Sequence, residues 1–255
     1  MHMSSLHSRV WGKYHRTLAS LFCRRMVPVK TAAPIISFSF DDVPKTALST
    51  GGQILVAHGI KATYYVSLGL LGSETEVGTI ASADDLAQAL KEGHELGCHT
   101  FDHLDAWETT TETFLESVAK NQLALNKIIP GAMFKTFAYP KSGAKLAIKP
   151  HLQQYFTCCR GGGQAANVGA TDFNLLRACF LDQRTKIDMN SVRNLIDYIT
   201  SCPGWLIFAT HDVTHNPSPY GITPEFFAEV VEYAASSSAF ILPVAEAAGK
   251  LQGTI

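Results

Sequence analysis

The 255-residue chain has no excess of charge of either sign, because 21 Lys and Arg side chains oppose 22 Asp and Glu side chains and leave a net charge of −1. A nucleic-acid-binding protein needs a basic face, so this balance argues against nucleic acid as a partner. With 46% hydrophobic residues, the chain also lacks the composition of a disordered polypeptide. Its length allows one large α/β domain or two small ones.

The six cysteines form no CxxC pair and no regular disulfide framework, and the neighbours Cys158 and Cys159 are poorly placed to bridge each other. We therefore predict reduced thiols that are mostly buried. The chain has no apolar run of about 18 residues, the length that a transmembrane helix needs. Apolar stretches near the N-terminus, such as residues 18–23, are too short and interrupted for a signal peptide, so we expect a cytoplasmic protein.

Two nucleotide-binding signatures are missing, since no GxGxxG follows the first predicted strand and no GxxxxGK[ST] occurs anywhere. From residue 34 onward, short β-rich runs alternate with helical patterns. This alternation predicts a mainly parallel sheet covered by helices, and seven or eight such units favour a closed (β/α) barrel over an open doubly wound sheet. We expect strands at 35–40, 61–67, 94–99, 135–139, 155–160, 174–180, 205–211 and 239–244, and helices near 46–58, 82–92, 111–128, 188–201 and 223–237.

Chemically active side chains follow several predicted strands at their carboxyl ends. In a (β/α) barrel these ends, and the loops after them, carry the active site. Each motif alone is commoner as an ordinary turn or a surface histidine, but their convergence at one end of the barrel indicates a site. The residues are Asp41 and Asp42 after the first strand, His99 and His103 after the third, and His211 after the seventh.

Two neutral imidazoles and one carboxylate are a familiar ligand set for a catalytic zinc ion, which keeps a position open for water or substrate. Such an ion lowers the pKa of water towards about 7 and polarises a carbonyl group. Adjacent strand side chains point to opposite sides, so only one carboxylate of the pair Asp41 and Asp42 can readily bind the ion. The other is free to act as a base.

The order of these residues resembles that of the polysaccharide deacetylase (NodB-homology) family of carbohydrate esterases. The family's first motif, TFDDG, is similar to SFDDV at 39–43, and its second, H[ST]xxH, is present as HTFDH at 99–103. Its third motif, often RPPYG, resembles FAYPKSG at 137–143, and its last, an apolar strand ending in His, resembles LIFATHD at 206–212. The first two motifs are the specific ones.

Carried over by position, the resemblance implies a deformed (β/α) barrel that hydrolyses an N-acetyl group on an amino sugar of an oligosaccharide, polysaccharide or glycolipid. It implies a divalent metal, zinc with cobalt or nickel as alternatives, held by Asp42, His99 and His103. It also implies that Asp41 is the general base, that a water activated by the metal attacks the acetamide, and that His211 protonates the leaving amine.

Two positions depart from the family pattern. Ala138 stands where the third motif has the arginine that pairs with the catalytic Asp, and Val43 stands where Gly usually follows the Asp pair. We expect Arg160, after the fifth predicted strand, to supply the missing guanidinium to Asp41, with Arg177 as the alternative. Val43 is expected to reshape its turn without removing a ligand.

Several further residues are candidates for contact with substrate. The backbone N–H of Lys141 is expected to help hold the oxyanion, and Asp182 is expected to keep His211 protonated. Aromatic residues on the active face would stack on a sugar ring, although isolated aromatic residues are commoner in packing roles. The candidates are Tyr139, Pro140, Lys141, Trp107 and Tyr220.

Two other functions stay open on this reasoning. One is hydrolysis of a small cyclic amide or a ureide by an amidohydrolase of the same broad superfamily. The other is a barrel that has lost catalysis and binds carbohydrate or a partner protein, a hypothesis that the missing third-motif arginine motivates.

Residues 1–30 differ in charge from the barrel domain predicted at 31–255. They contain six basic residues and no acidic one, a charge of +6, whereas the rest has 15 basic and 22 acidic residues, a charge of −7. We expect this basic extension to pack on the barrel, to close its base or to pair two subunits. The alternative is attachment to an anionic surface at the inner face of the membrane. Apolar spacings near three to four predict an amphipathic helix with the apolar positions Leu6, Val10, Trp11, Tyr14, Leu18, Leu21 and Phe22.

Overall fold

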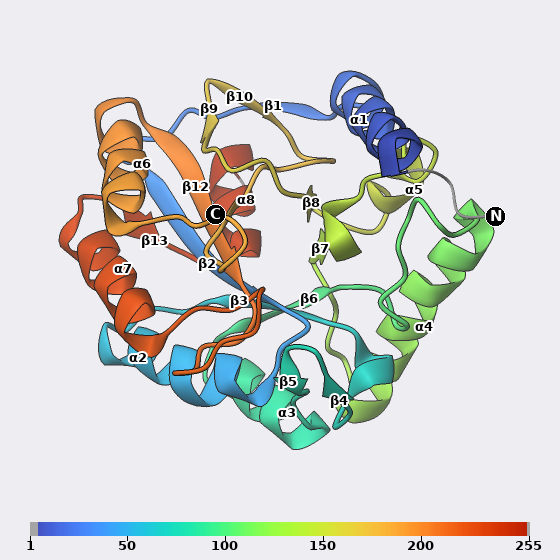
Figure 1. The fold of residues 1–255 in the computed structure, drawn as a ribbon, viewed down its shortest axis with the longest axis horizontal. Helices are drawn as coiled ribbons and strands as arrows, with labels where there is room; N and C mark the ends of the chain where they lie inside the picture. The colour runs from blue at the N-terminus through green and yellow to red at the C-terminus, as the bar shows by residue number, and fades with distance from the viewer. Residues whose placement is uncertain (1–4, 254–255) are drawn as a thin grey trace.

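The computed structural model describes residues 5–253, and their side chains except those of residues 5–11 and 13. At its centre lies a curled sheet of parallel strands surrounded by helices (Figure 1), which confirms the predicted (β/α) barrel. A short strand, β13 (Phe240–Ile241), adds to β2 in parallel. Across the sheet the order is β11 (Cys179–Phe180), β12 (Gly204–Thr210), β2 (Ile35–Asp41), β3 (Thr63–Val66), β6 (Glu95–Cys98), β7 (Thr136–Ala138) and β8 (Cys158–Arg160).

The two edge strands of this sheet, β8 and β11, are joined through the segment that precedes β11. Arg160 forms an isolated parallel bridge with Leu176, and the Gly161 N–H donates to the Leu176 carbonyl at 2.9 Å. The barrel is therefore closed by a few hydrogen bonds rather than by a continuous strand pair, which is the deformation that the family resemblance implied.

Five predicted helical segments are present with nearly the expected ends. Ser82 and Asp85 form a capping box at the start of α3, and the Thr223 side chain caps α7 just before Pro224, so two of these starts rest on local capping chemistry. The first segment is divided into a π-helical turn and a short α-helix. The bounds are η1 (Ala47–Gly52) with α2 (Gln53–Ala57), α3 (Ala83–Lys91), α4 (Thr111–Ile128), α6 (Met189–Ser201) and α7 (Pro224–Ser236).

Most of the elements that the sequence analysis missed are short, because two to four residues are too few to show a period. Strand β1 pairs with β10 and β9 pairs with β12, both antiparallel, and β4 and β5 form a hairpin. Helix α8 starts where a strand was predicted to end. These elements are β1 (Met26–Pro28), β4 (Glu74–Thr75), β5 (Gly78–Thr79), β9 (Asn167–Val168), β10 (Ala170–Asp172), η2 (Leu68–Leu70), η3 (Pro140–Ser142), α5 (Lys149–Leu152) and α8 (Val244–Gln252).

The central strand β2 is buried along its whole length. One of its faces packs against the outer helices and the other faces the barrel interior. Phe38 and Phe40 face outward and pack edge-on against Phe227 of α7. Ile35, on the opposite face, belongs to a separate buried cluster with Trp205 of β12 inside the barrel. Side chains alternate along a strand, so Asp41, the last residue of β2, also faces the barrel interior.

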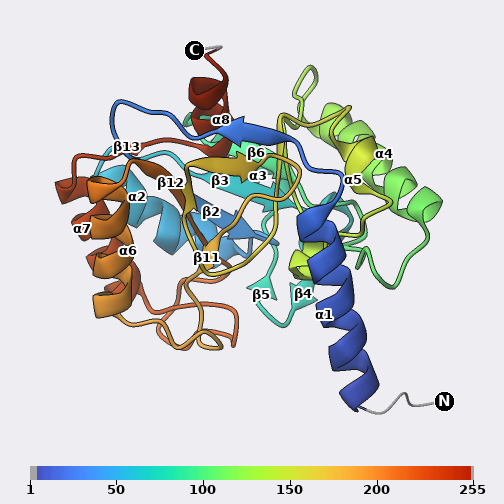
Figure 2. The ribbon, with the colours of Figure 1, turned by 90° about the horizontal axis from the view of Figure 1, so that it is seen from above.

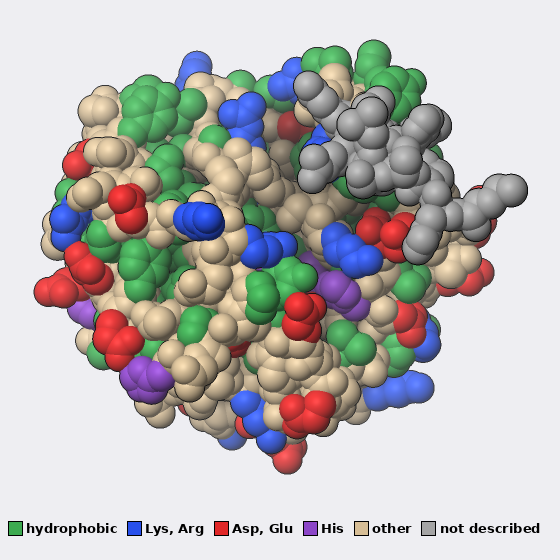
Figure 3. All heavy atoms as spheres, in the orientation of Figure 1, with side chains coloured by type: hydrophobic (Ala, Val, Ile, Leu, Met, Phe, Trp, Pro, Cys, Tyr) green, Lys and Arg blue, Asp and Glu red, His purple; other side chains and the backbone are tan. Residues whose placement is uncertain are grey.

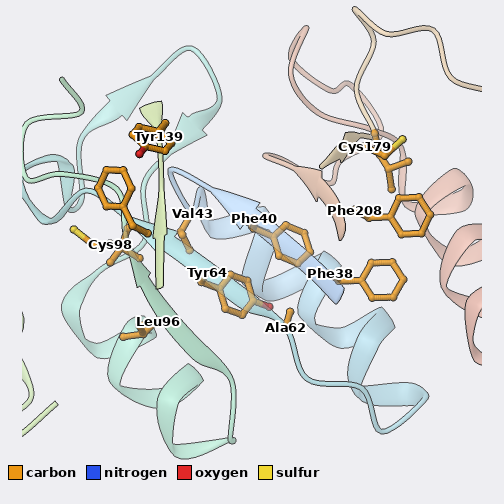
Figure 4. Packing of buried hydrophobic residues seen from close by; sticks show 14 of the residues in the cluster. Phe38, Phe40, Val43, Ala62, Tyr64, Leu96, Cys98, Tyr139, Cys179 and Phe208 are labelled. Carbon is orange, nitrogen blue, oxygen red and sulfur yellow. The ribbon is translucent and has the colours of Figure 1, made fainter. Parts of the chain in front are cut away.

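Aromatic pairs on the outer face follow the register of the parallel strands. Phe38 is the register partner of Phe208 on β12, and Phe40 that of Tyr64 on β3. Their rings stack with centroids 5.6 and 5.0 Å apart (Figure 4). Cross-strand contacts of this kind fix the register, and the register decides which residues meet at the carboxyl ends.

Helix α1 (Ser5–Leu21) projects from the barrel at its N-terminal end, and its C-terminal end lies near α5 (Figure 2). The ammonium of Lys149, which is fully buried on α5, donates to the Ala19 and Phe22 carbonyls at 2.6 and 3.0 Å. It also pairs with Asp172 of β10 at 2.8 Å. Lys149 therefore satisfies carbonyls at the end of α1 and attaches the helix to the barrel.

Among the predicted apolar positions of this helix whose side chains are described, Leu18 is half-buried and the other three are exposed. Tyr14, Leu21 and Phe22 are exposed, whereas Ala19 is buried. The side chains of the remaining positions before residue 14 lie outside the described residues. The boundary of the extension at residue 30 stays a prediction.

All six cysteines are free in the structure, and four of them are buried while Cys23 and Cys202 are exposed, which confirms that most of the thiols are buried. Between residues 5 and 253, no helix combines the length and the hydropathy that crossing a bilayer requires.

Candidate functional site

The carboxyl ends of the central strands surround a cavity of about 490 Å³. The charged and imidazole residues predicted from the strand ends all line it, so the expected convergence occurs. The lining comprises Asp41, Asp42, Thr75, Glu76, Val77, His99, His103, Lys141, Ser142, Phe180, Arg184, His211 and Tyr220.

Asp42, His99 and His103 bring three possible metal ligands together in this cavity. Asp42 Oδ1 lies 3.7 Å from His99 Nε2 and 3.3 Å from His103 Nε2, and all three ligand atoms lie within 4.8 Å of one another. Asp42 Oδ1 is buried and has no hydrogen-bond partner in the described part of the chain. A divalent cation between the three atoms would satisfy it.

The protonation of His99 suits a metal ligand. Its Nδ1 lies 2.8 Å from the Ala138 carbonyl, which can only accept, so Nδ1 carries the proton and Nε2 presents a lone pair towards Asp42. Burial lowers the pKa of His99 to about 3 and also lowers that of His103, so both rings are neutral. Burial raises the pKa of Asp42 to about 6, and a bound cation would favour its ionised form. The donor set therefore fits a divalent metal.

Four residues around the ligands adopt the left-handed conformation that favours glycine. They are Asp42, Val43, Thr100 and His103, with φ between 52° and 59°. Val43 is β-branched, which makes this conformation strained, and its turn is held because the Ala81 N–H donates to the Val43 carbonyl at 3.0 Å. Valine thus keeps the backbone conformation expected of glycine there, and Asp42 stays within reach of the two candidate histidine ligands.

Arg160 supplies the guanidinium that Ala138 does not. It is fully buried, and its Nη2 donates to Asp41 Oδ1 while its Nη1 donates to the Gly161 carbonyl at 3.0 Å. Ala138 on β7 and Arg160 on β8 are register partners, so the arginine enters the barrel at the same level from the next strand. Arg177, the alternative, lines a different cavity.

The environment of Arg160 keeps Asp41 ionised. Its guanidinium lies between the rings of Tyr65 and Phe180, 5.0 and 5.3 Å from their centroids. Burial alone would raise the pKa of Asp41, but Arg160, with smaller contributions from His99 and His211, lowers it below the ordinary value.

His211 faces the same cavity from the end of β12. Its Nε2 lies 4.0 Å from Asp42 Oδ2, and its Nδ1 lies 3.2 Å from the Tyr220 carbonyl. The expectation that Asp182 partners His211 is wrong, because both Asp182 carboxylate oxygens accept from Arg184 and Thr185 instead. A backbone carbonyl, not a carboxylate, orients the imidazole.

Asp212 has a role that sequence reasoning missed. Its carboxylate accepts from the Ser218 N–H at 2.8 Å and the Ser218 hydroxyl at 2.5 Å, which folds the Pro-rich loop back over the site. A side chain at Gly221 would collide with Asp212, since its Cβ would lie 2.3 Å from the carboxylate carbon. This loop carries Tyr220 to the cavity, and a single Asp after a strand gives no local signal of such a role.

The candidates for substrate contact divide into two groups. Lys141 and Tyr220 line the cavity. Tyr139 and Pro140 are buried, and the Tyr139 hydroxyl donates to the Asn174 carbonyl, so neither side chain faces the cavity. Trp107 also lies outside the lining, and its indole N–H donates to the Ala144 carbonyl at 3.1 Å. The contacts of these three side chains are those of packing residues, and a substrate contact for them stays a prediction.

The β4–β5 hairpin and Arg184 complete the rim. The hairpin contributes Thr75, Glu76 and Val77, and the Arg184 guanidinium lies 4.2 Å from the centroid of the Tyr220 ring. Strands of two residues give no detectable alternation, so the sequence did not reveal this wall.

Comparisons with known proteins agree with this geometry. A family model described as polysaccharide deacetylase matches residues 29–155. The peptidoglycan-N-acetylglucosamine deacetylase of Listeria monocytogenes is 30% identical over 100 residues, 39% of this chain and 20% of that protein. A gellan lyase of a Bacillus species is 28% identical over 132 residues, 52% of this chain and 5% of that protein. The chain thus spans a fifth or less of these relatives' lengths.

Solved structures share the fold. A family 4 acetyl xylan esterase from Clostridium thermocellum, in complex with a cobalt ion, is 18% identical with a TM-score of 0.62, over 87% of this chain and 93% of that chain. The chitin deacetylase of the fungus Colletotrichum lindemuthianum is 16% identical with a TM-score of 0.59, over 85% of this chain and 88% of that chain. At such identities the likeness establishes the barrel fold alone.

Proposed function

This chain belongs to the polysaccharide deacetylase family, and from that premise we propose that it is a metal-dependent hydrolase that removes N-acetyl groups from amino sugars of an oligosaccharide, polysaccharide or glycolipid. The observation that carries the proposal is one cavity that holds a three-residue metal-ligand set, an Asp beside it that is held ionised by a buried arginine, and a histidine facing both.

Asp42, His99 and His103 would hold the metal. When bound, a divalent ion lowers the pKa of a nearby water and polarises a carbonyl oxygen. The residues fit zinc, cobalt or nickel, because imidazole and carboxylate ligands suit all three.

Asp41 is the proposed general base. Its pairing with Arg160 keeps the carboxylate ionised and fixes its position in the barrel, where it lines the cavity next to the ligand Asp42. An ionised carboxylate can accept a proton from the attacking water, and correct placement of such a base contributes about 10²- to 10⁴-fold to the rate.

His211 is the proposed general acid. The Tyr220 carbonyl can only accept, so Nδ1 is the donor to it, and Nε2, which faces Asp42 and the cavity, is the nitrogen that would hold the proton to be transferred. This proton would pass to the nitrogen of the leaving amine as the C–N bond of the acetamide breaks. The Lys141 backbone N–H is proposed to donate to the developing oxyanion.

The test is acetate release from N-acetylglucosamine oligomers by the enzyme loaded with zinc, cobalt or nickel, compared with the chelated enzyme. His99→Ala should lose both bound metal and turnover. His151→Ala, an exposed histidine on α5, should keep both. Turnover that does not depend on metal, or no turnover across a broad panel of acetylated glycans, would contradict the proposal.

The alternative is an amidohydrolase that acts on cyclic amides or ureides. A panel of such small molecules tests it, because faster turnover of these compounds than of any glycan would favour this second function. The hypothesis of a non-catalytic barrel was based on the missing third-motif arginine. Because Arg160 pairs with Asp41, that reason no longer applies.

A further inference from the structure

A second cavity of about 450 Å³ lies beside the catalytic one. One wall is the C-terminal half of α1 with the residues that follow it, and the opposite wall is the segment 162–177. Ser142 lines both cavities, so they share a wall. Figure 3 shows Lys and Arg side chains around the hollowed middle of one face of the molecule, beside a histidine.

Three arginines from separate parts of the chain line this second cavity. Arg16 comes from α1, Arg24 follows that helix, and Arg177 precedes β11. None of the three forms an ion pair within the described residues. We call this space the arginine cavity.

The one acidic residue of the arginine cavity does not offset these charges. Asp172 is buried, its Oδ2 pairs with Lys149, and its Oδ1 accepts the Arg25 and Asn174 N–H groups at 2.8 and 2.9 Å. Its negative charge is therefore already matched by a cation. The arginine cavity keeps a net positive charge on a domain whose overall charge is negative.

Glycine keeps the space between the two cavities free. A Cβ at Gly162 would lie 3.3 Å from the Ser142 hydroxyl and 3.5 Å from the ring of Phe180. Ser142 belongs to both cavities and Phe180 to the catalytic one, so a side chain here would fill the boundary between them. A ligand in the catalytic cavity can thus extend towards the arginines.

We propose that the arginine cavity binds an anionic group, a carboxylate or a phosphate, on the part of the glycan next to the acetylated sugar. This inference rests on the proposed deacetylase function and narrows its substrate class to acidic glycans. Guanidinium groups bind carboxylates and phosphates through paired hydrogen bonds, and the volume is that of a small-ligand pocket. The concave shape fits a sugar substituent better than a flat bilayer surface.

The experiment compares kcat/KM for neutral N-acetylglucosamine oligomers with that for oligomers alternating N-acetylglucosamine and glucuronic acid, and for phosphorylated N-acetylglucosamine oligomers. The wild type should prefer one or both acidic series, and the two series distinguish carboxylate from phosphate. In the triple variant Arg16→Gln, Arg24→Gln, Arg177→Gln, the acidic-to-neutral ratio should fall roughly tenfold, as expected for three exposed charge contacts.

Arg193→Gln is the matched control, because Arg193 is an exposed arginine on α6 that pairs with Glu229 outside both cavities, and it should keep the wild-type ratio. Arg177→Glu alone tests the charge without touching α1, and it should lower the ratio further than Arg177→Gln. A wild-type ratio of one, or a ratio unchanged in the arginine variants, would overturn the inference.

Calorimetric binding of the same oligomers separates failure of this inference from failure of the proposed function. Tighter binding of acidic oligomers that the triple variant loses supports the arginine cavity even if no acetate is released. Equal binding of neutral and acidic oligomers overturns it even if the enzyme is active. Another outcome is that the triple variant loses binding to anionic phosphatidylglycerol vesicles and keeps the wild-type acidic-to-neutral ratio of kcat/KM. That result would assign the arginines to a membrane surface and overturn the inference.

Discussion

Two buried ion pairs serve different purposes in this protein. Arg160 pairs with Asp41 at the carboxyl end of the barrel, and Lys149 pairs with Asp172 where α1 joins it. Both cations are fully buried. Asp172 uses both carboxylate oxygens in hydrogen bonds to Lys149, Arg25 and Asn174, whereas Asp41 bonds only Arg160 among the described residues and lines a cavity.

Asp41 and Asp172 differ in how many hydrogen bonds their carboxylate oxygens can still accept. An Asp whose oxygens are all bonded to protein can only hold the structure together. An Asp that is held ionised by one strong partner, with capacity left towards a cavity, can accept a proton. Burial and a salt bridge are common to both residues, so only substitutions at each pair distinguish a catalytic carboxylate from a structural one.

The largest expected effect is on turnover. Asp41→Asn keeps the shape of the side chain but removes the basic oxygen, so kcat should fall by about 10²- to 10⁴-fold. Bound metal, measured by elemental analysis, should stay at the wild-type level. Asp84→Asn, an exposed position on α3, should change neither. A fully active Asp41→Asn enzyme would remove Asp41 from the mechanism.

Arg160→Met tests whether the guanidinium acts through Asp41. We expect kcat to fall by about 10- to 100-fold, the usual cost of losing a group that orients an active-site residue. Arg160→Lys keeps the positive charge but loses the planar guanidinium group. Its kcat should therefore lie between that of the wild type and that of Arg160→Met. Steady-state kinetics with a folding check by circular dichroism measures this. Equal activity in all three proteins would show that the pair is only structural.

Lys149→Met should act on stability instead. Removing the cation leaves Asp172 and the carbonyls at the end of α1 without their partner, which should cost about 3–5 kcal/mol in the free energy of unfolding. Denaturant titration measures the loss, and Lys127→Met on the exposed face of α4 should stay within about 0.5 kcal/mol of wild type. The kcat of the folded Lys149→Met protein should match wild type.

Glu95 is a third type of buried carboxyl group. The smallest expected effect is that of Glu95 on the pH dependence of stability. It accepts hydrogen bonds from Thr63, Thr136 and the Ala245 N–H but forms no ion pair in the described part of the chain, and burial raises its pKa above the ordinary value of 4.5. The folded protein therefore keeps this proton to higher pH than the unfolded chain does. Its contribution to stability decreases as pH rises from the ordinary value through the raised one.

Glu95→Gln should remove this dependence. Unfolding free energies measured across the acidic range should fall less steeply with rising pH in the variant than in the wild type. An identical slope in the two proteins would contradict the raised pKa of Glu95.

Local chemistry made much of the fold predictable. The helix starts at Ser82 and Thr223 follow from capping, and β2 follows from the β-rich run IISFSF at 35–40. Positions after strands indicated which Asp and His residues converge, and the family resemblance singled out Asp42, His99 and His103 among them as metal-ligand candidates. Short antiparallel strands and the β4–β5 hairpin could not be predicted, because their pairing partners lie elsewhere in the chain or their length hides any period.

The sequence by itself determined which residue types the site contains and in what order, because motifs such as HTFDH carry their spacing locally. Only the tertiary structure decided how the site is completed. Arg160 replaces the guanidinium absent at Ala138 because β7 and β8 pair in register, and the Tyr220 carbonyl orients His211 because Asp212 folds the loop back. Strand register and loop closure depend on contacts between distant residues, so no local pattern specifies them.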